Sequence, residues 1–224
     1  MRVVLRIGGS VVASPINTEL IGKYAALLKN LKEQDHEIAV VVGGGTLARE
    51  FISIAKTLEL NEQAQDEIAI SVSRVFAQLF TNKLGRLSCS TVPLTVEEAV
   101  NCLSRGKIVV MGGLKPGMTT DSVAALIAER VNAGLLVKGT DQDGVYNKDP
   151  KKHHDAVKLD RLSFDDLVGV FSESKHKAGI HQIIDPEAVK ILKRQHVRLV
   201  VVNGFAPENI LTAINGESVG TVVS

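Results

Sequence analysis

The sequence of 224 residues has no tryptophan, only 4% aromatic residues and only two cysteines. With so few aromatic rings, the chain lacks the stacking platform that single-stranded nucleic-acid-binding proteins use. Cys89 and Cys102 are too few for a secreted disulfide scaffold, and their spacing is not that of metal ligands. We therefore expect both to be reduced, buried thiols.

The sequence also lacks an excess of charge of one sign. Lys and Arg number 26 against 25 Asp and Glu, so no net field favours nucleic acid or a membrane surface. No apolar run reaches the roughly 20 residues of a membrane-spanning helix. The first apolar run, at 3–7, carries Arg6 and ends at two glycines, unlike the core of a signal peptide. These absences predict a cytoplasmic protein with no nucleic-acid or membrane partner.

Short apolar runs rich in β-branched residues alternate with helical patterns along the whole chain. The runs lack polar alternation, which is typical of strands buried on both faces of a parallel sheet. They lie at residues 3–7, 38–42, 108–111, 135–137 and 199–202. The helical patterns lie at residues 19–31, 46–58, 67–79, 96–104, 122–131 and 186–195. This order predicts an α/β fold, and because no linker or repeat divides the chain, we expect one domain over residues 1–224.

The first helix has an apolar face that allows two interpretations. It could pack into the core or could form a dimer contact, and the core is the simpler expectation. The face consists of Ile21, Tyr24, Leu27, Leu28 and Leu31.

Three glycine-rich turns follow predicted strands, at residues 8–10, 43–45 and 112–113. The carboxyl ends of strands are where α/β sheets bind ligands, and glycine lets backbone N–H groups approach a phosphate closely. One such turn could serve only a tight bend, but three in one chain indicate a polyphosphate ligand. Neither the P-loop pattern nor the dinucleotide-binding glycine pattern is present, which disfavours those two classes of enzyme.

Polar residues beside these turns could bind the anion, although each also has a simpler interpretation. Arg49 lies one helical turn beyond Gly45, so its guanidinium could hold a phosphate or pair with a surface carboxylate. Asp66 could cap a helix, the simpler interpretation, or accept a hydrogen bond from a sugar hydroxyl. Residues 119–121 open a helix, where they could bind an anion or merely cap the helix.

Two carboxylates follow the fourth predicted strand. Asp141 and Asp143 could orient cations around phosphates or hold a hydrated Mg²⁺, although Asp-Gly is also an ordinary turn dipeptide. The histidines at 153–154, 176 and 181 could suggest a metal site, but adjacent histidines point apart and we expect solvated loop residues instead. We therefore expect no metal site built from protein ligands.

The turn at 8–10, the turn at 43–45 followed by Ala48 and Arg49, and the segment TDQDGVYNKDP at 140–150 resemble the amino-acid kinase family over most of the chain. Within that family, the short length, the segment GGLKPGMTTD at 112–121 and the IDP triplet at 184–186 are similar to archaeal UMP kinases. The resemblance implies a three-layer α/β/α sandwich with an eight-stranded, mainly parallel sheet. It also implies an acceptor-binding lobe of about residues 1–113, an ATP-binding lobe of about residues 114–224, and a homohexamer.

The same resemblance implies direct, in-line transfer of the γ-phosphate of MgATP to UMP in pyrimidine nucleotide biosynthesis, with no general base. It implies that ATP is held by Gly9, Ser10, Gly45, Arg49, Thr140, Tyr146 and Asp149. It implies that UMP is held by Gly44, Asp66, Leu114, Lys115, Pro116, Gly117, Met118, Thr119 and Thr120.

Four residues are the expected catalytic group. Many relatives have lysine two residues before the first glycine, where this chain has Arg6. We expect Arg6 and Arg49 to stabilise the migrating phosphoryl group, Asp143 to orient cations or water around Mg²⁺, and Lys177 to supply a second cation.

Two other functions remain open at this stage. One is a kinase of the same fold for another acceptor, such as isopentenyl phosphate; those kinases usually carry a histidine near the second glycine turn, and none is present there. The other is a non-catalytic protein that binds or stores a nucleotide.

Overall fold

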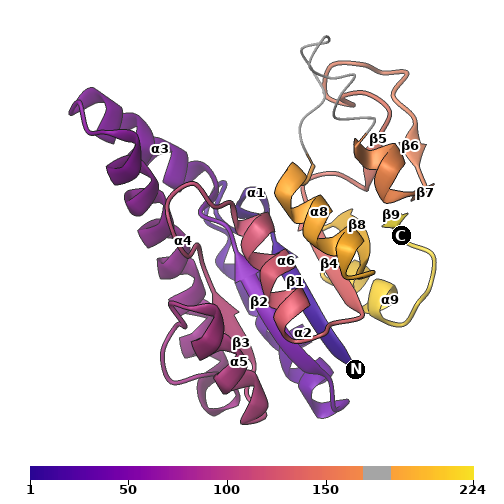
Figure 1. Ribbon diagram of the computed structural model, residues 1–224, viewed down its shortest axis with the longest axis horizontal. Helices are drawn as coiled ribbons and strands as arrows, with labels where there is room; N and C mark the ends of the chain where they lie inside the picture. Colours follow the sequence, from indigo (N-terminus) through magenta and orange to yellow (C-terminus); the bar gives the residue numbers. More distant parts are fainter. Residues whose placement is uncertain (169–182) are drawn as a thin grey trace.

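The computed structural model describes residues 1–168 and 183–224, and its centre is a seven-stranded sheet in the order β3-β2-β1-β4-β8-β9-β7 (Figure 1). Neighbouring strands are parallel except for the β8–β9 pair. The strands are β1 (Arg2–Ile7), β2 (Glu37–Val42), β3 (Val109–Met111), β4 (Leu135–Thr140), β7 (Arg161–Leu162), β8 (Arg198–Asn203) and β9 (Thr221–Val223). The α/β class and the mainly parallel sheet are confirmed. The expected count of eight strands is wrong for the described residues, because β5 (Val145–Tyr146) and β6 (Lys158–Leu159) form a separate two-stranded ribbon.

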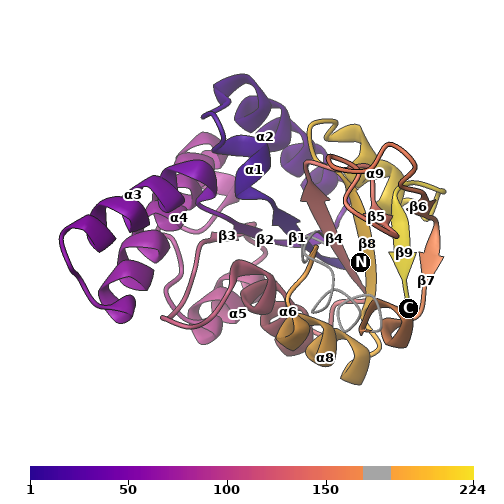
Figure 2. The same ribbon diagram turned by 90° about the horizontal axis from the view of Figure 1, so that it is seen from above.

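Helices cover both faces of this sheet, as Figure 2 shows from above. One face packs against α2, α4 and α9, and the other against α5, α6 and α8. The helices are α1 (Gly9–Val12), α2 (Thr18–Glu33), α3 (Gly45–Thr57), α4 (Glu62–Leu84), α5 (Val96–Ser104), α6 (Thr120–Arg130), α8 (Pro186–Arg194) and α9 (Glu208–Ile214), with a 3₁₀ turn η1 (Gly85–Leu87). The three-layer sandwich is therefore present. None of the described helices is long and apolar enough to cross a membrane.

The central strand β1 shows why the apolar runs lack polar alternation. Val3 and Leu5 face the layer that contains α2, whereas Val4 faces the layer that contains α6, and all three are buried. Successive side chains of a strand point to opposite faces, so a strand with helices on both sides needs apolar residues at every position.

The apolar face of α2 belongs to the core, as expected. Tyr24 and Leu28 are fully buried, and burial of a side chain of that size contributes roughly 2–3 kcal/mol. The hydroxyl of Tyr24 donates a hydrogen bond to the carbonyl oxygen of Gly204 at 2.8 Å, which satisfies its polar tip. Burial raises the pKa of Tyr24 far above its usual value, so the phenol stays neutral. This contact ties α2 to the loop after β8.

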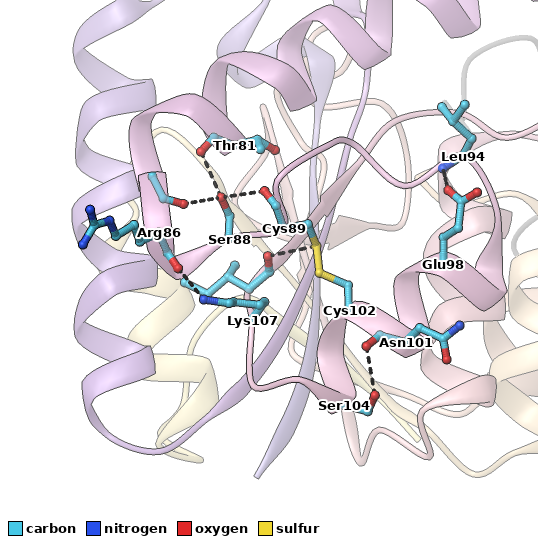
Figure 3. The surroundings of a disulfide bond; sticks show 12 residues. Thr81, Arg86, Ser88, Cys89, Leu94, Glu98, Asn101, Cys102, Ser104 and Lys107 are labelled. Carbon is cyan, nitrogen blue, oxygen red and sulfur yellow. Dashed lines mark hydrogen bonds between the residues drawn. A yellow bond between two sulfur atoms is a disulfide. The ribbon is translucent and has the colours of Figure 1, made fainter.

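The expectation of two reduced cysteines is wrong. Cys89 follows η1, Cys102 lies in α5, and the two form a disulfide with their Cα atoms 6.0 Å apart (Figure 3). The backbone N–H of Cys89 donates to the carbonyl oxygen of Ile108 at 3.2 Å, beside the beginning of β3. That pairing at the edge of the sheet brings Cys89 against α5. The sequence spacing could not show it, because the contact depends on the register with residue 108.

Candidate functional site

Two adjoining cavities lie at the carboxyl ends of the parallel strands. The first, of about 630 Å³, opens at the ends of β1, β2 and β4. The second, of about 610 Å³, lies between α3, α4 and the loop before α6. Both are lined by Gly44, Arg49 and Thr120. A molecule in one cavity can therefore touch a molecule in the other at these three residues.

The first two glycine turns pack against each other on the wall of the first cavity. A Cβ atom on Gly9 would lie 2.0 Å from the backbone nitrogen of Gly45, and one on Gly45 would lie 2.3 Å from the carbonyl oxygen of Gly9. Gly45 also has φ of +61°, which favours glycine. Both glycines are thus required by packing.

The floor of the first cavity is a buried cluster of two cations and one carboxylate. Arg6 Nε lies 2.7 Å from Asp121 Oδ1, and Lys138 Nζ lies 2.5 Å from Asp121 Oδ2. The three side chains are 14%, 11% and 8% exposed for Arg6, Asp121 and Lys138. Arg6 also donates to Thr120 Oγ1 at 2.8 Å, and Lys138 donates to the carbonyl oxygen of Ile183. The cluster therefore holds one more positive than negative charge.

Two pKa values in this cluster are shifted. Burial alone would raise the pKa of Asp121, but the adjacent Lys138 and Arg6 hold it below its usual value. Burial lowers the pKa of Lys138, and the attraction of Asp121 offsets only part of that effect. Asp121 is thus an anion at neutral pH. A buried cluster with surplus positive charge stabilises anionic oxygens that enter the cavity, because water screens the interaction little there.

Lys138 is a functional candidate that sequence reasoning missed. It lies in β4 among residues that are buried on both faces. Lysine is almost never fully buried unless it is paired. Lys138 directly follows the apolar run at 135–137, which was predicted to be buried. That position was a signal that the lysine needs a buried carboxylate partner.

The second cavity is organised by hydrogen bonds from α4 to the loop before α6. Asp66 Oδ2 accepts from the backbone N–H of Gly117 at 2.7 Å, and Ser73 Oγ accepts from that of Gly113 at 2.8 Å. Arg74 donates to the carbonyl oxygens of Gly113 and Leu114, at 3.0 Å each. The expected helix-capping role of Asp66 is wrong, because α4 begins four residues earlier and its cap is Asn61. Asp66 instead lines the cavity.

The threonines before α6 have two different roles. Thr119 caps α6 by accepting from the backbone N–H of Ser122 at 3.1 Å, and it donates to Asp185, the cap of α8. Thr120 faces both cavities and accepts from Arg6. The capping interpretation thus holds for Thr119, while Thr120 is placed where an anion would lie.

The residues predicted for the ATP and UMP sites are brought together only in part. The first cavity is lined by Arg6, Gly9, Ser10, Gly44, Gly45, Arg49, Thr120 and Thr140. The second is lined by Gly44, Arg49, Asp66, Lys115, Gly117, Met118, Thr119 and Thr120. Among the described residues, five predicted ones line neither cavity: Leu114, Pro116, Asp143, Tyr146 and Asp149. Lys177 lies outside the described residues.

Asp143 points to a different partner from the one expected. Its Oδ1 accepts a hydrogen bond from Asn203 Nδ2 at 2.8 Å, and the side chain is exposed. The carboxylate at the cavity is that of its neighbour Asp141, which pairs with Lys151 Nζ at 2.6 Å. Asp141, the first of the two carboxylates considered from the sequence, is therefore the better placed one.

Within residues 1–168 and 183–224, no three His, Cys, Asp or Glu side chains gather as a metal site. Mg²⁺ usually keeps several waters and is held by one or two carboxylates and by substrate phosphates. Asp141 accepts from Lys151 and Thr140, but its side chain is 29% exposed and lines the first cavity, so it fits that donor set. Asp121 is more deeply buried, between Lys138 and Arg6.

The chain matches the amino acid kinase family over residues 1–203. It is 44% identical to the uridylate kinase of Methanocaldococcus jannaschii, with 100% of this chain and 99% of that protein covered. It is 39% identical to the uridylate kinase of Methanobrevibacter smithii over the same shares. The crystal structure of uridylate kinase from Archaeoglobus fulgidus superposes with a TM-score of 0.90 at 40% identity, covering 100% of both chains. The UMP kinase of Ureaplasma parvum, 22% identical with a TM-score of 0.81 over 100% of this chain and 98% of that one, has the same fold.

Proposed function

The chain belongs to the amino acid kinase family, and we propose that it transfers the γ-phosphate of ATP to UMP, giving UDP and ADP. It is a nucleoside monophosphate kinase, and the reaction places it in pyrimidine nucleotide biosynthesis. The observation that carries the proposal is the meeting of two cavities at Gly44, Arg49 and Thr120. One cavity has surplus positive charge and the other has a carboxylate and apolar walls, which suits a polyphosphate beside a nucleoside.

The proposed reaction needs positioning and electrostatics more than covalent work by the protein. An oxygen of the UMP phosphate attacks the γ-phosphorus of ATP, and the bond from that phosphorus to the bridging oxygen of ADP breaks. The acceptor is already largely deprotonated at pH 7, so no general base is required. Arg6 and Lys138 stabilise the migrating group from the floor of the first cavity, and Arg49 does so from the junction.

Mg²⁺ is the expected companion of ATP and, when bound, neutralises charge on the phosphates. Asp141 is the carboxylate that we propose would contact it, directly or through water. Lys151, which also lines the first cavity, pairs with this carboxylate.

The two substrates divide between the two cavities in this proposal. ATP phosphates take the first cavity with Gly9, Ser10, Gly45 and Thr140, while UMP takes the second. Tyr146 and Asp149 stay predictions as contacts of the ATP nucleoside. The division of the chain into lobes near residue 113 also stays a prediction, in which the loop at 115–120 reaches back to the acceptor cavity.

Asp66 is the residue that we propose selects a nucleoside. Its Oδ2 is engaged by the backbone N–H of Gly117, which fixes the carboxylate in the second cavity. A fixed carboxylate accepts hydrogen bonds from sugar hydroxyls or from a base N–H, whereas isopentenyl phosphate offers neither. A preference for acceptors with a ribose supports this assignment, and equal use of isopentenyl phosphate contradicts it.

The experiment that tests the function measures ADP release from MgATP with UMP, CMP, AMP, isopentenyl phosphate, acetylglutamate, carbamate and no acceptor. We expect turnover with UMP, and in Arg49→Ala a fall in kcat/KM for UMP of about 30-fold, the size of a lost charge-assisted hydrogen bond. Lys56→Ala is the matched control, because Lys56 is an exposed cation on the same helix. It should leave kcat/KM unchanged.

Other outcomes of that panel would select the alternatives. A higher rate with isopentenyl phosphate would identify a kinase for another acceptor. ATP binding with no turnover on any acceptor would identify a nucleotide-binding or storage protein and would contradict the proposed enzyme.

We propose further that the chain forms a homo-oligomer through the outer face of α3 and α4. Large apolar side chains on this face are 43–65% exposed, which marks an interaction site when they are contiguous. They are Phe51, Ile54, Leu58, Val75 and Leu79. Sedimentation should show an oligomer, with a hexamer expected from the family resemblance, and Ile54→Glu should shift it to smaller species. A monomeric wild-type chain would exclude this role.

A cytoplasmic location is proposed because the two nucleotide substrates are used there. Recovery of the protein in the membrane fraction of cells would contradict it.

A further inference from the structure

A third hollow, of about 800 Å³, lies at the opposite end of β3 from the acceptor cavity. Lys107 precedes the strand and lines this hollow, whereas Gly113 follows the strand and lines the acceptor cavity. The disulfide between Cys89 and Cys102 forms part of the wall (Figure 3). The hollow is thus separate from the cavities assigned to substrates, and its most reactive group is a disulfide.

The two cysteine residues differ in exposure. Cys89 is 8% exposed and is held by backbone pairing to Ile108. Cys102 is half-buried on α5. Cys102 is therefore the cysteine at which we expect a solute in the hollow to react.

Three cationic residues line the same hollow as this disulfide. Arg86, Arg105 and Lys107 come from η1, from the end of α5 and from the segment before β3, and all three line the hollow. None of the three forms an ion pair with a carboxylate in the part of the chain that the structure describes. Lys107 Nζ donates to the carbonyl oxygen of Arg86 at 2.7 Å.

Among the described residues that line the hollow, Glu98 is the one acidic side chain. Its Oε2 accepts a hydrogen bond from the backbone N–H of Leu94 at 2.7 Å, so it stabilises the beginning of α5. Three positive charges against one negative leave a local surplus that attracts anions over roughly 10 Å at moderate salt.

We propose that Cys89–Cys102 is an exchangeable disulfide and that the hollow admits small acidic thiols to it. The thiolate of such a molecule attacks Sγ of Cys102 and forms a new bond to that sulfur. The bond between Cys102 and Cys89 breaks, and Cys89 leaves as a thiolate that takes a proton from solvent. Sγ of Cys89 lies 3.6 Å from the carbonyl oxygen of Ile108, so the new thiol has an acceptor in place. A second thiolate attacks the sulfur of the bound small molecule, releasing the small disulfide and the thiolate of Cys102.

In the complete exchange, two small thiols are oxidised to one small disulfide and one protein disulfide is reduced to two thiols. The surrounding cations favour each thiolate, because positive charge stabilises the ionised form of a thiol. The exchange releases α5 from the segment at residues 88–89. That segment is fixed on its other side to α4, where Ser88 Oγ donates to the carbonyl oxygen of Thr81 at 2.9 Å. The inference does not depend on the proposed kinase activity.

The test follows reduction of the oxidised, folded, full-length protein by three thiols. The anionic thiol is 3-mercaptopropionate, the neutral one is 2-mercaptoethanol and the cationic one is cysteamine. Each reduction rate is divided by the thiolate concentration, so that the three thiols can be compared. Samples are quenched with acid and analysed by mass spectrometry. At low salt we expect the anionic thiol to react about threefold faster than the neutral one and the cationic one more slowly. High salt should remove the difference, and the mixed disulfide should be on Cys102.

Variants make the result specific to this hollow. Arg105→Gln combined with Lys107→Gln should abolish the preference for the anionic thiol, while Lys56→Gln, a distant exposed cation, should retain it. Equal rates for the three thiols at low salt would overturn the proposal. So would reduction that occurs only at the rate of global unfolding, because the disulfide would then be a closed structural link.

Discussion

Replacing Lys138 by methionine should lower kcat for phosphoryl transfer by about 100-fold to 1,000-fold, the effect of removing one preorganised charge from a transition state. Lys138 Nζ lies on the floor of the first cavity, 2.5 Å from Asp121 Oδ2. Methionine keeps a stem of similar length in a strand that is buried on both faces. Asp121 keeps its pair with Arg6, so the variant should fold while lacking the positive charge.

The measurement is the initial rate over a range of ATP and UMP concentrations, so that kcat separates from the two KM values. A catalytic charge changes kcat more than KM for UMP. Lys193→Met is the matched control, because Lys193 is exposed on α8 and pairs with Asp165 at the surface. A Lys138→Met variant that keeps more than about a third of the wild-type kcat would leave Arg6 as the sole buried cation of the mechanism.

The contrast between Arg6 and Lys138 shows what sequence reasoning could find. Arg6 was predicted because it stands two residues before a glycine turn, where the resembling family often has lysine, and that relation is local in the sequence. Lys138 was missed because its partner Asp121 lies 17 residues earlier on a different element. Only the parallel pairing of β1 with β4 sets Arg6 beside Lys138 in register. Local spacing predicted one cation, and tertiary packing was needed for the other.

The same distinction separates the elements that were predicted from those that were missed. Long helices and doubly buried strands were found within a few residues, except for α4, which was predicted at residues 67–79. It begins at Glu62, because Asn61 supplies an early cap, and it continues to Leu84. The short helices α1 and α9 were missed, and so were the strands β5, β6, β7 and β9. These have seven residues or fewer, too few to show a helical or strand period. Strand β9 is also antiparallel to β8, a pairing that the βαβ pattern does not predict.

Replacing Asp121 by asparagine should lower the free energy of unfolding at pH 7 by about 3 kcal/mol, the usual cost of removing one partner from a buried ion pair. The carboxylate is 11% exposed and is the shared partner of Arg6 and Lys138. Asparagine is nearly the same size, so the loss reports charge and not volume. Urea unfolding measures it, and Asp165→Asn, which breaks an exposed pair with Lys193, should change the midpoint little.

The dependence on pH tests the assignment of charge. Because the folded pKa of Asp121 is below its unfolded value of roughly 4, its contribution is complete above that value and is lost as pH falls through the folded pKa. The difference between wild type and Asp121→Asn should therefore shrink in acid. It should also shrink in alkali, because the lowered pKa of Lys138 lets this buried lysine become neutral sooner than an exposed one. A difference that stays constant across this range would mean that the loss does not come from the charge of Asp121. The phosphates of ATP would supply negative charge to the same two cations, Arg6 and Lys138. ATP should therefore stabilise the Asp121→Asn variant more than the wild type, which would show that the cluster that Asp121 stabilises is also the one that binds phosphate.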